Sequence, residues 1–125
     1  MARLLYLDDD GALVALVARH LERAGHSVAG FTNAPEALAV FRALPSQFDL
    51  VITDMSMLGA SGLDFAKEVL AIAPSAVVVI ATGCEEPNWA AHARASGVRA
   101  VIEKPTDAGE MAARLAALLP GTGSS

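Results

Sequence analysis

The sequence is poor in cysteine, in basic residues and in aromatic residues. Its single cysteine, Cys84, can form no internal disulfide and cannot by itself make a thiolate metal site. Nine Lys and Arg stand against fourteen Asp and Glu, and the basic residues form no cluster, which argues against direct binding of nucleic acid. Aromatic residues make up only 5% of the chain, with one tryptophan and one tyrosine.

Long apolar runs are also missing. The longest uncharged stretch, residues 69–84, is interrupted by Pro74, Ser75 and Thr82, which excludes it as a membrane-spanning helix. The first ten residues end in three acids and contain no basic segment followed by a long apolar one, so no secretory signal is predicted. We therefore expect a cytoplasmic protein without membrane association.

What is present is a hydrophobic, alanine-rich chain with the length of one domain. Hydrophobic residues make up 54% of it, which excludes intrinsic disorder. A chain of 125 residues suits a single domain that buries roughly two-thirds of its extended-chain surface. We expect this domain over residues 1–119 and a flexible tail or linker stub over residues 120–125, where Pro120, Gly121 and two serines gather.

Short apolar runs alternate with segments of helical period along the chain. Strands are predicted at residues 4–7, 27–31, 48–53, 77–81 and 100–102. Helices are predicted at residues 11–24, 33–44, 61–73, 87–96 and 106–118. Gly25 and Gly97 follow two of these helices, where a left-handed C-terminal cap is typical.

This alternation predicts the fold class. The third strand contains the continuous run Leu50 to Ile52, which is typical of a parallel sheet covered by helices on both faces. Five strand–helix units with short connections indicate an α/β protein. We expect a flavodoxin-like (βα)5 three-layer sandwich with a parallel five-stranded sheet of order 2-1-3-4-5.

Polar residues follow four of the predicted strands, at the edge where such sheets bind ligands. Asp8 and Asp9 follow the first strand, Asp54 the third, Thr82 the fourth and Lys104 the fifth. The first and third strands are neighbours in this order, so the three aspartates should converge, and Mg²⁺ would relieve their repulsion. Lys104 and Thr82 could then hold the oxygens of a phosphoryl group, with a carboxylate as nucleophile.

Five segments, in this order, resemble the receiver domains of two-component response regulators. They are Leu-Tyr-Leu-Asp-Asp-Asp at 5–10, Val-Ile-Thr-Asp-Met-Ser-Met at 51–57, Ser-Gly-Leu at 61–63, Ala-Thr-Gly at 81–83 and Glu-Lys-Pro at 103–105. The resemblance covers nearly the whole chain. It implies that Asp54 is the phosphoacceptor for a sensor histidine kinase or a histidine phosphotransfer protein. Residues 97–101 and the Thr-Gly pair also look like receivers of the hybrid histidine kinase type.

The resemblance implies a role for each residue around the acceptor. Asp8 and Asp9 would be the metal-binding acid pair, and the Ser56 carbonyl would complete the ligands of a Mg²⁺ or Mn²⁺ ion that the acceptor carboxylate also binds. Lys104 would pair with the phosphoryl group, and Thr82 would be the switch hydroxyl.

Such a domain is a regulatory phosphoacceptor that assists its own phosphorylation and dephosphorylation, not an enzyme acting on other substrates. Phosphorylation would bias a two-state surface around residues 83–105, which a downstream effector or a fused domain reads. The cognate kinase, the output and homodimerisation stay open. The Lys104–Pro105 peptide bond, often cis in the family, is not assigned from sequence.

Three residues depart from the family pattern. Leu58 stands where a proline is common, Gly83 where alanine is usual, and Val101 where many members have Tyr or Phe. Leu58 and Val101 motivate a second hypothesis, a pseudo-receiver that acts as a constitutive protein-interaction module. A third, a Mg²⁺-dependent phosphatase of small substrates, is disfavoured because 125 residues show no evident lid or substrate pocket.

Structural interpretations compete with the functional ones at single positions. Asp8 to Asp10 could all serve as helix caps, and Asp10 by itself is interpreted as a cap or a surface acid. Gly59 and Gly62 make no phosphate-binding signature. The histidines have no metal-ligand spacing and are interpreted as surface or helix-face residues: His20, His26 and His92.

Overall fold

The computed structural model describes residues 2–57, 60–83, 91, 93–105 and 107–119. The strands are β1 (Arg3–Leu7), β2 (Ser27–Phe31), β3 (Leu50–Asp54), β4 (Ser56–Met57), β5 (Ala60–Ser61), β6 (Val78–Thr82) and β7 (Ala100–Glu103). The helices with described bounds are α1 (Gly11–Arg23), α2 (Ala34–Ala43), α3 (Gly62–Ile72) and α5 (Ala108–Ala117). Residues 91 and 93–95 are also helical and belong to the helix predicted at 87–96.

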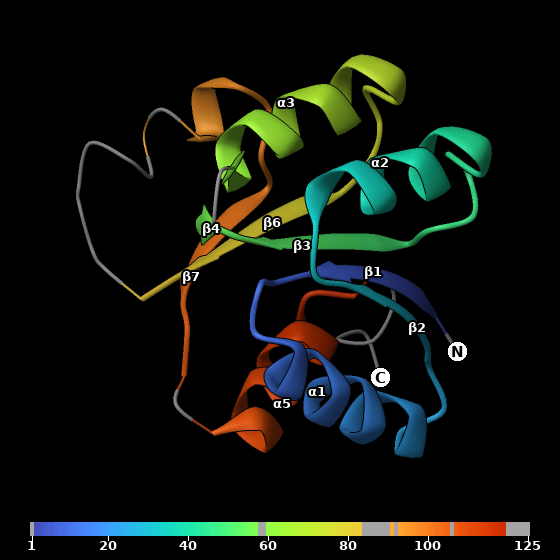
Figure 1. Ribbon diagram of the computed structural model, residues 1–125, viewed down its shortest axis with the longest axis vertical. Helices are drawn as coiled ribbons and strands as arrows, with labels where there is room; N and C mark the ends of the chain where they lie inside the picture. Colours follow the sequence, from blue (N-terminus) through green and yellow to red (C-terminus); the bar gives the residue numbers. More distant parts are fainter. Residues whose placement is uncertain (1, 58–59, 84–90, 92, 106, 120–125) are drawn as a thin grey trace.

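Five strands form one parallel sheet in the order β2-β1-β3-β6-β7. Counted as the five main strands, this is the predicted order 2-1-3-4-5. Helices α1 and α5 cover one face of the sheet, and α2 and α3 cover the other (Figure 1). The α/β three-layer fold expected from the sequence is therefore confirmed.

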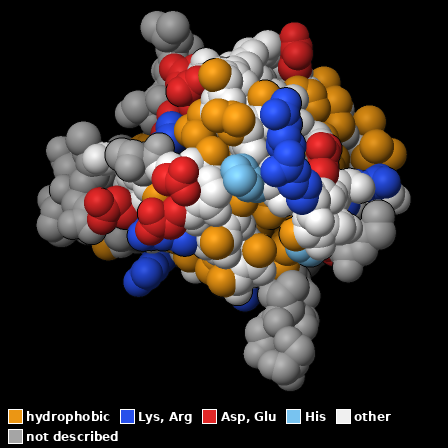
Figure 2. Space-filling model, turned by 90° about the horizontal axis from the view of Figure 1, so that it is seen from below, with side chains coloured by type: hydrophobic (Ala, Val, Ile, Leu, Met, Phe, Trp, Pro, Cys, Tyr) orange, Lys and Arg blue, Asp and Glu red, His pale blue; other side chains and the backbone are white. Residues whose placement is uncertain are grey.

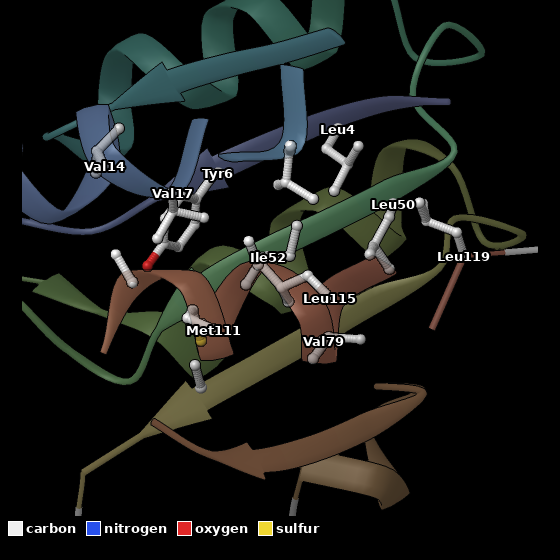
Figure 3. Packing of buried hydrophobic residues seen from close by; sticks show 14 residues of the cluster. Leu4, Tyr6, Val14, Val17, Leu50, Ile52, Val79, Met111, Leu115 and Leu119 are labelled. Carbon is white, nitrogen blue, oxygen red and sulfur yellow. The ribbon is translucent and has the colours of Figure 1, made fainter. Parts of the chain in front are cut away.

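Two hydrophobic clusters, one on each face, hold the layers together. Alternate residues of a strand point to opposite faces, so Leu4 and Tyr6 of β1 belong to the cluster under α1 and α5 (Figure 3). Leu5 and Leu7 belong to the cluster under α2 and α3. All five residues of β3 are buried, as its continuous apolar run predicted.

The outer surface of the α1 and α5 layer is mixed in character. Figure 2 looks onto this side of the molecule and shows hydrophobic side chains interspersed with charged ones of both signs. Leu16 of α1 is one of two large hydrophobic residues that the described part of the chain exposes, with Leu44 after α2 as the other. No helix in the described ranges has both the length and the apolar character to cross a bilayer.

The helix signals in the sequence are largely confirmed. The Asp10 side chain accepts a hydrogen bond from Leu13 N at 3.1 Å, and Asn33 accepts one from Glu36 N at 2.9 Å. These bonds satisfy backbone donors that the first turn of a helix leaves unpaired. Gly25 and Gly97 have φ of 96° and 100°, the left-handed conformation expected after a helix.

Some boundaries differ from the predictions. The last helix begins at Ala108 and not at residue 106, because the Asp107 side chain accepts a hydrogen bond from Glu110 N at 2.9 Å and caps it. Strand β3 begins at Leu50 and not at 48, and the loop expected after Asp54 contains the short antiparallel pair β4 and β5. Outside the described residues lie the predicted tail 120–125, the first turn of the predicted helix 87–96, and Leu58, Cys84, Trp89 and His92.

Candidate functional site

Three strands deliver charged side chains to one edge of the sheet. Asp8 follows Tyr6 by two residues, Asp54 follows Ile52 by two, and Lys104 lies just past the end of β7. Tyr6 and Ile52 both face α1 and α5, so the two aspartates continue that face at the carboxyl ends of neighbouring strands. The fold thus brings together three of the strand-end residues that the sequence singled out, Asp8, Asp54 and Lys104.

The aspartates form a compact carboxylate cluster. One carboxylate oxygen from each of Asp8, Asp9 and Asp54 can be chosen so that all three lie within 4.8 Å of one another. Asp8 and Asp54 are buried, whereas Asp9 is exposed. A hard cation that prefers oxygen ligands and keeps several waters fits this set, because two ligands are fixed in the protein and the third side is open to solvent. The residues therefore fit Mg²⁺.

Lys104 lies between the two buried carboxylates. Its Nζ is 2.6 Å from Asp8 Oδ2 and 3.6 Å from Asp54 Oδ2. The Asp8 side chain is only 1% exposed and that of Lys104 is 20% exposed, so solvent screens this pair weakly. The sequence predicted that Lys104 would pair with the phosphoryl group, and no residue pattern indicated that Asp8 would be its nearer partner in the unmodified chain.

Each buried carboxylate also accepts hydrogen bonds from its own strand or the turn after it. Asp10 N donates to Asp8 Oδ1 at 3.0 Å, and Met55 N donates to Asp54 Oδ1 at 2.9 Å. The Tyr6 hydroxyl donates to Asp8 Oδ2 at 3.4 Å. Sequence reasoning missed Tyr6 as part of the site, and the available signal was its spacing of two residues before Asp8 within a strand.

The electrostatics of the cluster follow from burial and from like charges. Burial and the Asp8 charge raise the pKa of Asp54, while Lys104 opposes them. Burial acts to lower the pKa of Lys104, but its hydrogen bond to Asp8 and the nearby carboxylate charges outweigh it and raise that pKa. Burial, with the Asp8 charge, raises the pKa of the Tyr6 phenol, which therefore keeps its proton.

The backbone at Asp54 is fixed by the start of α3. Gly62 N donates to Met55 O at 2.8 Å, and a Cβ added to Gly62 would lie 2.1 Å from Asp54 O. Thr53 Oγ1 also donates to Asp54 O at 3.0 Å. No side chain fits between α3 and the end of β3, so a glycine is required here for close packing and not for a phosphate-binding loop.

The register of the short hairpin sets the direction of the Ser56 carbonyl. Ser56 pairs with Ser61 and Met57 with Ala60, while Gly62 N bonds to Met55 O. Hydrogen-bonded and non-hydrogen-bonded pairs alternate in an antiparallel ladder. The Ser56–Ser61 pair is therefore the non-hydrogen-bonded kind, so the Ser56 carbonyl points away from β5.

Thr82 and Val101 lie toward the other face of the sheet. Thr82 ends β6 two residues after Ile80, and Val101 pairs with Ile80 and packs against the cluster under α2 and α3. The backbone connects this side to the charged edge, because Lys104 N donates to Thr82 O at 2.8 Å. All described peptide bonds, including the one before Pro105, are trans.

The described histidines stay outside the site, as predicted. His20 is exposed on α1, and His26 Nδ1 accepts a hydrogen bond from Ala2 N at 3.1 Å near the opposite edge of the sheet.

Comparison with known proteins identifies the family. The sequence model described as the response regulator receiver domain matches residues 4–116. With the fold and the acidic edge described above, this match shows that the chain belongs to the receiver domain family of response regulators. These are signalling domains of two-component systems, and the comparisons give no support to the pseudo-receiver alternative.

Individual relatives and solved structures agree with this assignment. The chain is 29% identical over 104 residues to the chemotaxis protein CheY of Thermotoga maritima, covering 82% of this chain and 85% of CheY. A receiver domain structure from Clostridium thermocellum superposes with a TM-score of 0.81 at 30% identity, covering 90% of each chain. A Burkholderia pseudomallei response regulator, described with a phosphorylated aspartic acid and a calcium ion, has a TM-score of 0.81 at 28% identity, over 96% of this chain and 68% of that one.

Other relatives are much longer proteins. The chain is 35% identical over 100 residues to the C4-dicarboxylate transport transcriptional regulatory protein DctD of Rhizobium meliloti, covering 79% of this chain but only 21% of DctD. It is 31% identical over 124 residues to the sensory/regulatory protein RpfC of Xanthomonas campestris, and this alignment covers 96% of this chain but only 17% of RpfC.

Proposed function

We propose that Asp54 accepts a phosphoryl group from the phosphohistidine of a sensor histidine kinase or a histidine phosphotransfer protein. The observation that carries the proposal is the position of Asp54 Oδ2, 3.6 Å from Lys104 Nζ and within a cluster whose carboxylate oxygens lie within 4.8 Å of one another. Asp54 Oδ1 is engaged by Met55 N, so Oδ2 is the oxygen that faces the lysine. The Burkholderia neighbour, described with a phosphorylated aspartic acid, supports the same chemistry here.

In the transfer, the bond between phosphorus and the donor imidazole nitrogen breaks and a bond from phosphorus to an Asp54 oxygen forms. The imidazole nitrogen keeps the electron pair and takes up a proton. Lys104 is long enough to move from Asp8 toward the new phosphoryl oxygens, where its charge stabilises them. Hydrolysis by water reverses the modification, and the same residues assist it, so the domain contributes to both its phosphorylation and its dephosphorylation.

The proposed Mg²⁺ ligands are the carboxylates of Asp8, Asp9 and Asp54 and the carbonyl oxygen of Ser56. Mn²⁺ would substitute for Mg²⁺, because it accepts the same oxygen ligands. A bound Mg²⁺ supplies charge neutralisation for the phosphoryl oxygens and orients in-line attack. The exposed Asp9 leaves one side of the site open, which is the side from which a donor can approach.

The readout would involve Thr82 and the surface around residues 83–105. A hydroxyl at Thr82 could bind a phosphoryl oxygen and so bias this surface between two states, which a downstream effector or fused domain would read. Val101 occupies the position next to Ile80 with a small apolar side chain. Receivers that carry an aromatic ring at this position can couple phosphorylation to the surface through that ring. In this chain the coupling would have to use other residues.

The test is incubation with a small phosphodonor and Mg²⁺, followed by intact mass spectrometry. We expect one phosphoryl adduct on the natural chain and none on Asp54→Asn. Asp10→Asn is the matched control, because Asn caps α1 as well as Asp does and Asp10 points its side chain at Leu13 N and not into the cluster. It should be modified normally. Absence of an adduct on the natural chain, or an equal adduct on Asp54→Asn, would overturn the proposal.

A further inference from the structure

The single tyrosine of the chain is a buried polar group that the proposed transfer does not use. Tyr6 has no exposed surface and belongs to the cluster formed by β1, β3, α1 and α5 (Figure 3). Its labelled neighbours in that cluster, such as Val17, Ile52 and Met111, are apolar. A phenylalanine would fill the same space without bringing a hydroxyl that needs a partner.

The hydroxyl finds its partner at the charged edge of the sheet. It donates to Asp8 Oδ2 at 3.4 Å, and this is the oxygen that Lys104 Nζ contacts at 2.6 Å. Asp8 Oδ1 accepts from Asp10 N at 3.0 Å. The carboxylate of Asp8 is therefore oriented by three donors, of which only Lys104 sits at the end of a long, partly exposed side chain.

The three donors to the Asp8 carboxylate differ in whether their hydrogen bonds can persist when a divalent cation binds Asp8. Lys104 carries a charge that repels the cation, and the proposed transfer needs it at the phosphoryl oxygens. Tyr6 is neutral and its ring is enclosed by the core, so its hydroxyl remains beside Asp8. Hydrogen bonds from such outer groups commonly fix the orientation of a metal ligand.

We propose that Tyr6 is a positioning residue for the cation site, whose hydroxyl holds the Asp8 carboxylate in its binding orientation once Lys104 leaves it. The inference rests on the proposed function, because it requires Asp8 to bind Mg²⁺. It assigns a role in cation affinity to a core residue that has no exposed surface.

The test compares Tyr6→Phe with Ile52→Val in the full chain. Ile52 is the cross-strand neighbour of Tyr6 and is equally buried, so its variant disturbs the same part of the core without touching a polar group. Isothermal titration with MgCl₂ should show about tenfold weaker binding for Tyr6→Phe, the lower end of the range for lost outer hydrogen bonds. Ile52→Val should bind like the natural chain. Melting temperatures in EDTA verify that both variants fold.

Phosphorylation gives a second readout that a general loss of packing would not produce. With a small phosphodonor at limiting Mg²⁺, Tyr6→Phe should be modified more slowly than the natural chain, and saturating Mg²⁺ should restore its rate. A rate that stays low at saturating Mg²⁺ would contradict a role in cation affinity.

A direct probe is available because Tyr6 is the sole tyrosine. Uniform replacement by 3-fluorotyrosine labels this position alone, and its ¹⁹F resonance should shift saturably with MgCl₂. Equal or tighter Mg²⁺ binding by Tyr6→Phe, or an unmoved resonance in a chain that binds Mg²⁺, would overturn the inference and leave the proposed function intact. Failure of the natural chain to bind Mg²⁺ would overturn both.

Discussion

At the scale of single residues, Lys104 determines how the acidic edge is stabilised without a cation. Asp8 is fully buried, and a buried carboxylate without a positive partner is costly. Lys104 supplies that partner at 2.6 Å, so the cluster can persist before a cation binds. If Asp8 binds the proposed cation, the cation and Lys104 compete for the same carboxylate.

Replacing Lys104 should therefore separate stability from cation affinity. We expect Lys104→Met to lower the free energy of unfolding in EDTA by about 2 kcal/mol, less than the loss of a fully buried pair because the lysine is partly exposed. Its Mg²⁺ affinity should rise, and its phosphorylation should fall. Urea denaturation and calorimetric titration measure these effects.

Arg114→Met is the control, because its ion pair with Glu110 and its hydrogen bond to Glu103 O are both exposed and together should contribute less than about 1 kcal/mol. If Lys104→Met were as stable as the natural chain in EDTA, Lys104 would not be the partner that stabilises buried Asp8.

The raised pKa of Asp54 gives a pH dependence with a defined sign. An acid whose pKa is higher in the folded state binds its proton more tightly when folded, so stability falls as pH rises from 3.8, the ordinary value, through the raised one. Asp54→Asn has no carboxyl group at this position, so its stability should not fall over this pH range for that reason. We expect its melting temperature in EDTA to exceed that of the natural chain at neutral pH, with the advantage shrinking toward pH 3.8. A constant difference across this range would contradict the assignment.

Most of the charged residues of the site could be predicted from sequence, and Tyr6 could not. Asp8, Asp54 and Lys104 are polar residues placed directly after apolar strands, where a parallel sheet collects its ligands. Tyr6 lies inside an apolar strand, where a tyrosine normally indicates core packing. Its contact with Asp8 depends on side-chain geometry that the residue pattern does not contain.

At the scale of secondary structure elements, the contact between α3 and β3 fixes the proposed acceptor. Gly62 opens α3 directly against the carbonyl of Asp54, and its N–H bonds to Met55 O. Any movement of the start of α3 is therefore transmitted to the backbone that carries the Asp54 carboxylate.

Two glycine variants test this contact. Gly62→Ala places a Cβ 2.1 Å from Asp54 O, so the helix start has to shift. We expect it to lose about 2 kcal/mol of stability and to be phosphorylated more slowly even where it remains folded. Gly83→Ala is the matched control, because a Cβ there meets no atom of the described residues within 4 Å. It should be as stable as the natural chain or slightly more stable, by up to about 1 kcal/mol. Equal phosphorylation rates for the two folded variants would refute the role of the contact.

The elements with strong periodicity were predictable, and the small ones were not. The helix caps Asn33 and Asp10 carry their own signal in the residue type and its spacing. Strands β4 and β5 have two residues each, too few for an alternating pattern to emerge. Asp107 caps α5 one residue beyond the predicted start, since an adjacent threonine and aspartate are both good caps and only the hydrogen bond to Glu110 N distinguishes them.

At the scale of the whole molecule, cation binding should stabilise the fold. The proposed ligands lie at the end of β3 and in the segments that follow β1 and β3, and these strands meet only in the folded chain. A cation that binds the folded state alone raises the free energy of unfolding by about 2.7 kcal/mol at a concentration one hundred times its Kd. We expect MgCl₂ to raise the melting temperature and EDTA to reverse the change.

Asp9→Asn should reduce this stabilisation without disturbing the core, because Asp9 is exposed. NaCl of equal ionic strength is the control for general screening and should leave the melting temperature nearly unchanged. A melting temperature that does not respond to MgCl₂ would mean that the cluster does not hold the cation in the folded chain.

Short connections and buried runs leave few arrangements for five strand–helix units, and the predicted order is the known flavodoxin-like one among them. The two faces of the sheet carry residues with different proposed roles. Asp8 and Asp54 continue the side chains that face α1 and α5, whereas Ile80, Val101 and the end of β6 face α2 and α3. A single layer of backbone thus separates the residues that would receive the chemical group from those that would report it. Away from the contact between Gly62 and Asp54, substitutions on one face of the sheet should have little effect on the other face, so the surface that partners read could change while the proposed acceptor chemistry is kept.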